Sequence, residues 1–351
     1  MGAMGHDDST PAGDPAGDVT GVTTRFRRFL EDEFGGPVEL AAPVTTSGRG
    51  FDSDIYFVRV LGEALPAIWR GPLVLRVKAR PDALAEARFE ADVQDWAAAR
   101  GYPTPRVLRV FEAGELADGP AQVIERAPGD LVLDRAMHRP WAIRHLIGQL
   151  ARLQARLHRL DTSHFPEGVD LLDNRLRLTQ LTADALDHPG LREALARIES
   201  ITPELRTAPH SACHGDFHPL NVLVADESMS VIDWTDAGLG DRHADLARSL
   251  LLYDVAHIAA SSGIERQVLR RLGPVLGGIH RRAYERVLPI DGRRIHLWTA
   301  VHALHGWSQV VGAHEGIFHE GHTRPATSDR LPQTIVDELA HRFDAAMREV
   351  T

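Results

Sequence analysis

Residues 214–221 read HGDFHPLN, and twelve residues after Asn221 the chain reads Asp233-Trp234. Asp216, Asn221 and Asp233 supply side-chain oxygen atoms at this spacing. Phosphoryl transfer needs a carboxylate that orients the attacking hydroxyl and accepts its proton, together with oxygen ligands that hold Mg²⁺ on the nucleotide phosphates. A loop followed by a short hairpin can return the chain so that the second Asp faces the first. The spacing therefore predicts a phosphoryl-transfer site.

This motif resembles that of the aminoglycoside phosphotransferase family, small-molecule relatives of the protein kinases, and the resemblance covers about residues 40–255. It implies that Asp216 is the catalytic base and that Asn221 and Asp233 are metal ligands. It also implies that His214 supports the conformation of the loop. The implied reaction is Mg²⁺-dependent transfer of the γ-phosphate of ATP or GTP to a hydroxyl group of a small molecule.

Residues 240–247, GDRHADLA, resemble the continuation of the family's sequence after its metal-binding Asp. The resemblance implies that Asp245 hydrogen-bonds the loop backbone, and we expect Asp245 and Asp241 to be structural rather than catalytic. Cys213 and His214 are adjacent, but neighbouring side chains of an extended segment point to opposite sides. A cysteine–histidine nucleophile pair is therefore not expected.

Upstream of the motif, Glu90 stands where the family's ion-pairing helix Glu would be. Its partner should be a cation on the preceding strand, within residues 73–78. Arg76 and Lys78 are both available there, and strand alternation places them on the same face. A compact phosphate-binding charge favours Lys78, the only lysine of the chain, whereas the Leu-Arg strand of many relatives favours Arg76. The sequence does not choose between them.

Two further segments are expected to contact the nucleotide through the backbone. Ser47, Gly48 and Gly50 belong to a Gly-x-Gly turn whose N–H groups could cover the phosphates. Glu125 and Ala127 belong to a stretch that resembles the family's linker, where the adenine edge would pair with the backbone. These residues complete the predicted nucleotide site.

Hydrophobic periodicity indicates an α+β protein with a strand-rich first part and a helical second part, and the family resemblance implies a two-lobed, protein-kinase-like fold. Strands are expected at residues 55–61, 73–77, 107–111 and 121–125, and helices at 26–34, 81–100 and 143–160. A small hairpin is expected from 222–224 and 231–232, with helices from about His243 to the end. The expected organisation is a disordered tail (1–21), a β-rich nucleotide-binding lobe (22–125), a linker (126–130) and a helical lobe with the acceptor site (131–351).

Net charge, cysteine content and hydrophobicity exclude several classes of protein and partner. The 351 residues include 49 acidic and 39 basic ones, a net charge of −10, which argues against a nucleic-acid partner. The single cysteine excludes an intrachain disulfide and a cysteine-based zinc cage, and it fits a cytoplasmic protein. Residues 246–260 are too short and too polar to span a membrane, and no signal-peptide pattern opens the chain. Monomer and homodimer both remain open.

The acceptor is expected between the catalytic loop and the helices that follow the motif. Candidate contacts are His218, Asp254, Trp298, His302 and Trp307. Their mix of Trp and His favours a hydroxylated ligand with less charge than a polycationic aminoglycoside. An antibiotic such as an aminoglycoside or a macrolide and a metabolic alcohol or sugar both remain open.

The sequence offers two alternatives to a kinase, a metal-dependent hydrolase and a binding module without catalysis. A metal-dependent hydrolase could use His214, Asp216 and His218 as zinc ligands. A second histidine group comprises His302, His305, His319 and His322. The glycine and proline of the loop disfavour the regular helix that would align the first set. A binding module with a degenerate kinase fold would lack the base or a metal ligand, and all three are present.

Overall fold

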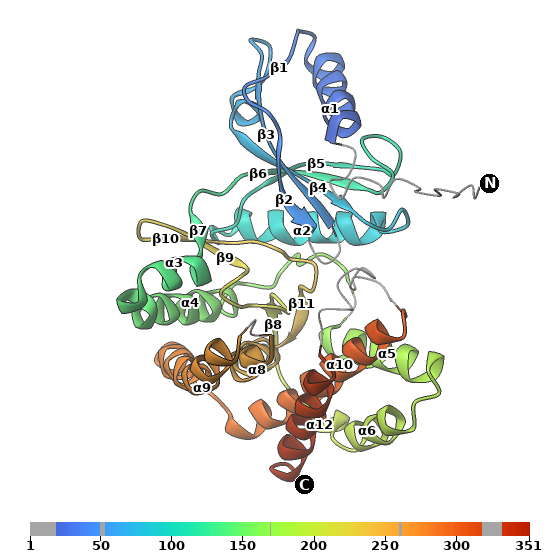
Figure 1. Ribbon diagram of the computed structural model, residues 1–351, viewed down its shortest axis with the longest axis vertical. Helices are drawn as coiled ribbons and strands as arrows, with labels where there is room; N and C mark the ends of the chain where they lie inside the picture. The colour runs from blue at the N-terminus through green and yellow to red at the C-terminus, as the bar shows by residue number, and fades with distance from the viewer. Residues whose placement is uncertain (1–18, 50–52, 169, 260–261, 318–331) are drawn as a thin grey trace, which may run out of the picture.

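The structure, a computed structural model, describes residues 19–49, 53–168, 170–259, 262–317 and 332–351 (Figure 1). An antiparallel sheet flanked by helices forms its amino-terminal part, and the carboxy-terminal part is mainly helical. The predicted two-lobed α+β class is therefore confirmed.

Six antiparallel strands form the sheet of the amino-terminal lobe, in the order β1-β3-β4-β6-β5 with β2 paired to β3. They are β1 (Glu39–Leu40), β2 (Thr45–Arg49), β3 (Ser53–Leu61), β4 (Pro72–Lys78), β5 (Val107–Phe111) and β6 (Ala121–Glu125). The predicted strands are confirmed, and for β5 and β6 both the first and the last residue are as predicted. In β4, Leu73 and Leu75 join the apolar core on one face, whereas Arg76 and Lys78 alternate toward the other. Strand alternation thus delivers two cations to the face that meets the second lobe.

Helix α1 (Val19–Phe34) packs Val22 and Leu30 into the core of the sheet. The prediction of a helix over 26–34 and of a disordered tail over 1–21 is wrong at this boundary, because the helix begins at Val19. The first turns are rich in Thr and Gly, which have low helix propensity, but burial of their valines outweighs that preference.

Helix α2 (Leu84–Ala99) crosses between the sheet and the helical lobe (Figure 1). Its end before Gly101, which adopts φ +71°, confirms the predicted stop. Val93 and Trp96 pack with Phe217 and Trp234 of the second lobe, so α2 connects the two cores.

Short strands lie at the top of the helical lobe. They are β7 (Asp130–Leu131), β8 (His210–Cys213), β9 (Val222–Ala225), β10 (Ser228–Val231) and β11 (Gly238–Asp241). β9 and β10 form the predicted hairpin, β7 pairs with β9, and β8 pairs with β11. The linker reaches β7 through Gly129, whose φ is +104° and where a Cβ would lie 2.3 Å from the carbonyl oxygen of Val224. Only glycine fits this close approach.

The rest of the lobe is helical and holds the largest apolar core. Its helices are α3 (Val132–His138), α4 (Ile143–Leu157), α5 (Leu171–Ala185), α6 (Pro189–Glu199), α7 (Thr202–Leu205), α8 (Arg242–Val255), α9 (Gly263–Glu285), α10 (Gly292–His314) and α12 (Gln333–Arg348). Single turns of 3₁₀ helix are η1 (Ala67–Arg70), η2 (Pro140–Ala142) and η3 (Ala256–Ala259). Helix α4 confirms the predicted leucine stripe but ends at Leu157, three residues before the predicted end. Helices α5 to α7 were not predicted. No helix among the described residues could cross a membrane.

Candidate active site

The loop after β8 is held open by a buried carboxylate. Asp245, at the start of α8, accepts hydrogen bonds from the amides of His214 (3.2 Å) and Gly215 (2.7 Å) and from Nε2 of His158 (3.0 Å). Burial raises the pKa of Asp245, but the bonds from His158 and the loop outweigh burial, and the pKa is lowered. Gly215 has φ +80°, and a Cβ there would lie 2.0 Å from the carbonyl oxygen of Asp236. Asp245 therefore hydrogen-bonds the loop backbone, and Gly215 allows the turn.

His214 joins the loop to the segment that carries Asp233. Its Nε2 donates to the carbonyl oxygen of Ile232 (3.0 Å), and its ring lies 4.9 Å from that of Trp234. The indole nitrogen of Trp234 is anchored on Thr104 of the first lobe (3.0 Å). Asp233 itself has φ +65°, uncommon for a residue with a side chain. The side chain of Asp233 is 44% exposed, whereas the neighbouring Trp234 is buried.

Asp216 lies at the tip of the loop between two basic side chains. Its Oδ1 accepts from Nε of Arg248 (3.1 Å), and its Oδ2 contacts Nε2 of His218 (3.0 Å). Burial raises the pKa of Asp216, but the charges of Arg248 and His218 outweigh it and hold the pKa well below its ordinary value. Asp216 is therefore ionised at neutral pH, as a base must be.

Sequence analysis missed Arg248 as a partner of Asp216. It lies on α8, three residues after Asp245 and thus about one turn further along the same helix. The sequence signal for Arg248 is a cation inside the largely apolar stretch 246–260. A charge in such a stretch is expensive to bury unless it is paired.

Asn221 closes the loop from its other end. Its Nδ2 donates to the carbonyl oxygen of Asp216 (3.0 Å), and its own amide donates to the carbonyl oxygen of His218 (2.9 Å). The carbonyl oxygen of Ile232 accepts the hydrogen bond from His214, and the Ile232 amide donates to the carbonyl oxygen of Asn221 (3.0 Å). The loop and the strand before Asp233 are thereby bound together.

A cluster of charges joins the two lobes. Glu90 of α2, 1% exposed, forms ion pairs with both Arg76 and Lys78, the latter at 3.0 Å. Nη2 of Arg76 also contacts Oδ1 of Asp233 (3.0 Å). Nζ of Lys78 lies 3.4 Å from the hydroxyl of Thr235. Both candidate cations therefore meet Glu90, and Arg76 connects Glu90 to the second lobe.

The predicted phosphate cover and linker are described in part. Ser47 and Gly48 fall in β2, and Gly50 lies outside the described residues. The amide of Glu125 donates to the carbonyl of Arg106 (3.0 Å), and its carboxylate binds the same arginine. Burial raises the pKa of Glu125, but Arg106 outweighs burial and lowers it. Ala127 lies in the linker, and its amide donates no hydrogen bond within the described part of the chain.

Two predicted acceptor contacts belong to the core instead. Trp298 and His302, on α10, are each 1% exposed. The indole of Trp298 donates to Asp241 (2.8 Å), and Nε2 of His302 donates to the carbonyl of Ala244 (2.9 Å). Burial lowers the pKa of His302 to about 3, so it is neutral. The prediction that these two side chains meet the acceptor is wrong, because α10 is apolar on most of its circumference and its sequence does not mark the face turned inward.

Asp254 and Trp307 make contacts elsewhere. Asp254 pairs with Arg342 of α12 (3.1 Å), although burial raises its pKa. The ring of Trp307 lies 5.9 Å from that of His188, edge to face. Of the five predicted acceptor contacts, His218 is the one that touches Asp216.

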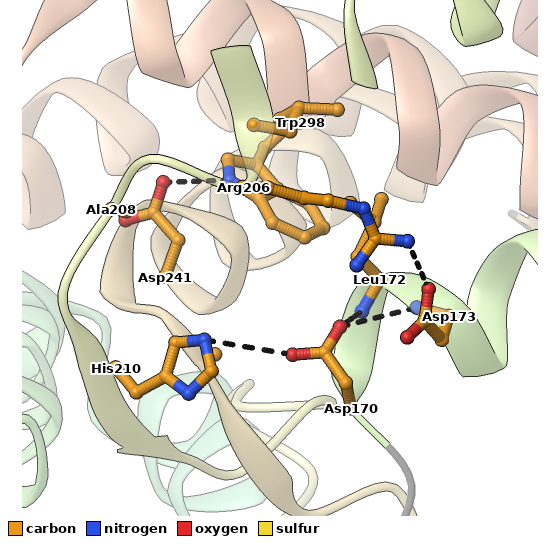
Figure 2. Close-up of a pocket in the computed structure, with 10 residues that line it drawn as sticks. Asp170, Leu172, Asp173, Arg206, Ala208, His210, Asp241 and Trp298 are labelled. Atoms are coloured by element: carbon orange, nitrogen blue, oxygen red, sulfur yellow. Dashed lines mark hydrogen bonds and ion pairs between the residues drawn. The ribbon is translucent and has the colours of Figure 1, made fainter. Parts of the chain in front are cut away.

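A pocket of about 300 Å³ borders Trp298, but it lies at the far end of β8 from the loop. Figure 2 shows Arg206 directed at Asp173 and His210 directed at Asp170 across it. Three residue steps separate His210 from Cys213, which is about 10 Å along a strand. Asp241 on its wall binds Trp298 and lies against His243 and Arg294, consistent with a structural role. These groups partner one another rather than a substrate.

Helix α5 supplies a second missed contact to the loop. Nη2 of Arg175 donates to the carbonyl of Gly215 (3.2 Å) and pairs with Asp236 (3.1 Å). Its Nη1 lies 3.1 Å from Nε2 of His305. The sequence offered no signal for Arg175, because it is one of 38 arginines and lies in a helix that was not predicted.

The side chains near Asp216 offer oxygen donors suited to magnesium rather than a zinc cage. Asn221 and Asp233 present an amide oxygen and a carboxylate, the ligand types that Mg²⁺ prefers. Across the described ranges there is no group of three or more His, Cys, Asp or Glu side chains able to hold a metal ion. His319 and His322 lie outside those ranges. The donor set fits a metal that the nucleotide phosphates help to hold.

Known proteins resemble this chain in sequence pattern and in fold. A sequence model of the phosphotransferase enzyme family matches residues 44–265. A structure from Ralstonia eutropha assigned as an aminoglycoside phosphotransferase has a TM-score of 0.58 at 14% identity, covering 93% of this chain and 98% of the other. A thermostable variant of aminoglycoside phosphotransferase APH(4)-Ia, in a ternary complex with ADP and hygromycin B, has a TM-score of 0.53 at 18% identity, covering 92% and 98%.

A variant of aminoglycoside 2'-phosphotransferase IIIa in complex with GDP has a TM-score of 0.54 at 15% identity, covering 93% of this chain and 97% of the other. No curated protein matches the chain in sequence. At these identities the solved structures establish the fold, whereas the family model spans more than half of the chain. The resemblance inferred from the loop motif is thus confirmed, and the chain belongs to the phosphotransferase enzyme family as a small-molecule kinase.

Proposed function

We propose that this kinase transfers the γ-phosphate of ATP or GTP to a hydroxyl group of a small molecule, with Asp216 as the catalytic base. The observation that carries the proposal is the chain of contacts from Glu90 through Arg76 to Asp233. Arg76 would be the phosphate-binding cation and Asp233 a metal-binding carboxylate. The bonds of Ile232 to His214 and Asn221 join the strand before Asp233 to the loop that carries Asp216, the base of this proposal.

Asp216 would orient the acceptor hydroxyl and accept its proton. Its lowered pKa means that it is ionised before the acceptor arrives. A carboxylate with so low a pKa is a weak base, so its main contribution would be to hold the hydroxyl in line with the phosphate. Arg248 and His218 would keep the carboxylate pointed into the cleft.

Asn221 and Asp233 would hold Mg²⁺, which neutralises charge on the transferring phosphate when bound. Arg76 would move from Asp233 to the phosphates, and Glu90 would keep its guanidinium in the cleft throughout. Lys78, paired with the same Glu90, would add a second charge. The amide of Ala127, in the linker, makes no hydrogen bond within the described residues, and it would donate one to an acceptor atom on the edge of adenine or guanine. Complexes of the structural relatives with ADP and with GDP leave both nucleotides as candidates.

The acceptor is a hydroxylated small molecule, and we propose an antibiotic as the first class to test. The side chains that touch Asp216 are basic or neutral, namely Arg248, His218 and Asn221. Such surroundings disfavour a polycation and favour a macrolide-like or weakly charged acceptor. A metabolic alcohol or sugar would satisfy the same surroundings and is the alternative. Buried Cys213 is a free thiol, compatible with the reducing cytoplasm where nucleoside triphosphates are found.

The test is release of nucleoside diphosphate from ATP or GTP with Mg²⁺ in the presence of a panel of acceptors. The panel comprises aminoglycosides, macrolides, peptide antibiotics, choline and sugars. Asp216→Asn should leave nucleotide binding nearly intact while turnover falls by roughly a hundredfold or more. Asp226→Asn is the matched control, because Asp226 is exposed in the turn between β9 and β10 and its positive φ suits Asn.

Acceptor-dependent release that Asp216→Asn abolishes and Asp226→Asn retains would support the proposal and identify the acceptor class. Turnover preserved in Asp216→Asn would refute the role of the base. Release only with choline or sugars would replace the antibiotic with the metabolic alternative.

A further inference from the structure

A concave site outside the candidate active site lies between helices α4 and α9, which pack against each other (Figure 1). Its volume is about 410 Å³, within the range of small-ligand pockets. Its lining consists of Trp141, Arg144, His145, Gly148, Arg152, Ile279, Arg282, Ala283 and Arg286. We call it the α4–α9 pocket. None of these residues belongs to the loop or the charge cluster of the active site.

Four arginines surround this pocket, and no Asp or Glu lines it. Arg144 and Arg152 come from α4, Arg282 and Arg286 from the end of α9. None of the four has a side-chain hydrogen bond or ion pair within the part of the chain that the structure describes. In a chain with ten more acidic than basic residues, so many unpaired cations at one place are unexpected.

The spacing makes the arrangement unfavourable without a counter-charge. Arg282 lies in the last turn of α9 and Arg286 caps its end four residues later, a spacing at which like charges on a helix repel by about 0.2–0.5 kcal/mol. Arg144 and Arg152 are eight apart and face the same side, with Gly148 between them. An anion in the pocket would convert this repulsion into attraction.

Glycine keeps the floor of the pocket low. A Cβ at Gly148 would lie 3.5 Å from Nη1 of Arg152, so that guanidinium extends back over the glycine. On α9, Arg282 extends in the same way over Gly278, at 3.3 Å from the position of its Cβ. The two guanidinium groups therefore lie along their helices, with their N–H groups available to a ligand between them.

A large aromatic ring stands at the rim. Trp141, in the 3₁₀ turn η2 that precedes α4, is 79% exposed. An exposed indole beside several guanidinium groups can stack on a planar ring, as in many nucleotide-binding sites. The pocket thus combines a planar apolar surface with forked cationic donors.

We propose that the α4–α9 pocket binds a ligand with two or more closely spaced phosphate groups. Arginine presents paired N–H donors that match phosphate oxygens, and one phosphate cannot reach cations on both helices as well as a chain of phosphates can. The ligand is either an inorganic polyphosphate or the polyphosphate of a nucleotide whose base stacks on Trp141. The site is separate from the proposed catalytic cleft and does not depend on its chemistry.

The test is calorimetric titration of the full chain with inorganic tripolyphosphate in EDTA, so that no metal bridges the ligand to the catalytic carboxylates. We expect one bound tripolyphosphate per chain and affinity that weakens as salt is raised. Arg152→Gln/Arg282→Gln should weaken binding by roughly tenfold or more, because each arginine supplies charged hydrogen bonds. Arg266→Gln/Arg271→Gln removes the same charge from the exposed first half of α9 and should leave binding unchanged.

The proposal would be overturned if Arg152→Gln/Arg282→Gln bound tripolyphosphate no more weakly than Arg266→Gln/Arg271→Gln. Loss of binding in Arg76→Gln with retention in the pocket variant would overturn it as well, because the ligand would then occupy the candidate active site. ATP separates the two sources: tighter binding of ATP than of tripolyphosphate, lost in Trp141→Ala, would identify a nucleotide. Equal binding of the two would identify a ligand whose phosphates alone are recognised. Circular dichroism would verify that each variant is folded.

Discussion

Two buried histidines should make the stability of the helical lobe depend on pH between 7 and 5. His280 and His302 are fully buried, and burial lowers the pKa of each to about 3. In the unfolded chain a histidine titrates near pH 6.5. Between these values the unfolded chain binds protons that the folded chain does not, so the free energy of unfolding falls as pH falls. The stabilisation is complete above about pH 6.5 and is lost as pH falls below it.

The expected magnitude follows from one proton per histidine. Each proton taken up only by the unfolded chain changes the free energy of unfolding by about 1.4 kcal/mol per pH unit. From pH 7 to pH 5 this amounts to about 2 kcal/mol for each histidine and about 4 kcal/mol for both. Asp241 and Asp245 do not obscure the effect, because their pKa values are lowered and the stability they contribute is lost only below about pH 4.

The assay is equilibrium unfolding in urea at pH 7 and at pH 5, followed by tryptophan fluorescence. His302→Asn removes the titrating group, and its amide can still donate to the carbonyl of Ala244. The difference in unfolding free energy between the two pH values should therefore shrink by about 2 kcal/mol relative to the wild type. Comparing differences cancels the cost of the smaller side chain. His341→Asn, on the exposed side of α12, is the matched control. An unchanged pH difference in His302→Asn would refute the reasoning.

Three further predictions concern the catalytic loop and the charge cluster. Gly215→Ala should reduce the free energy of unfolding by about 2–4 kcal/mol, because the residue has positive φ and its Cβ would meet a carbonyl oxygen; an unchanged urea midpoint would contradict this. Arg248→Gln should raise the pKa of Asp216 toward its ordinary value and move the acid limb of the pH profile of kcat/KM to higher pH, whereas a static limb would show that Arg248 does not act on the base. Arg76→Gln should raise the nucleotide KM by roughly tenfold and by more than Lys78→Gln does, and equal effects in steady-state kinetics would assign the two cations a shared role.

Much of the geometry of the candidate active site could be predicted from sequence because its parts are close together in the chain. Asp216 and Asn221 lie on one loop, and a short hairpin leads from it to Asp233. Short loops and hairpins restrict the distance between their ends, so the spacing of residue types carries geometric information. Strand alternation likewise predicts that the side chains of Arg76 and Lys78 lie on the same face of their strand.

Predictions failed where side-chain orientation depends on packing between distant segments. Helix α10 is apolar around most of its surface, so its sequence does not tell that Trp298 and His302 face the core. The start of α1 depends on the burial of Val22 against the sheet, which outweighs weak local propensity.

The sequence by itself determined the kinase-like class, the candidate catalytic loop and the strand that carries the two cations, because each depends on local spacing or periodicity. Only the tertiary structure decided that Glu90 pairs with both cations, that Arg76 reaches across to Asp233, and that Arg248 holds Asp216. These contacts join residues of separate elements, and their formation depends on how whole helices and strands pack. Local spacing does not encode that packing, because it arises from the burial of apolar faces distributed along the entire chain.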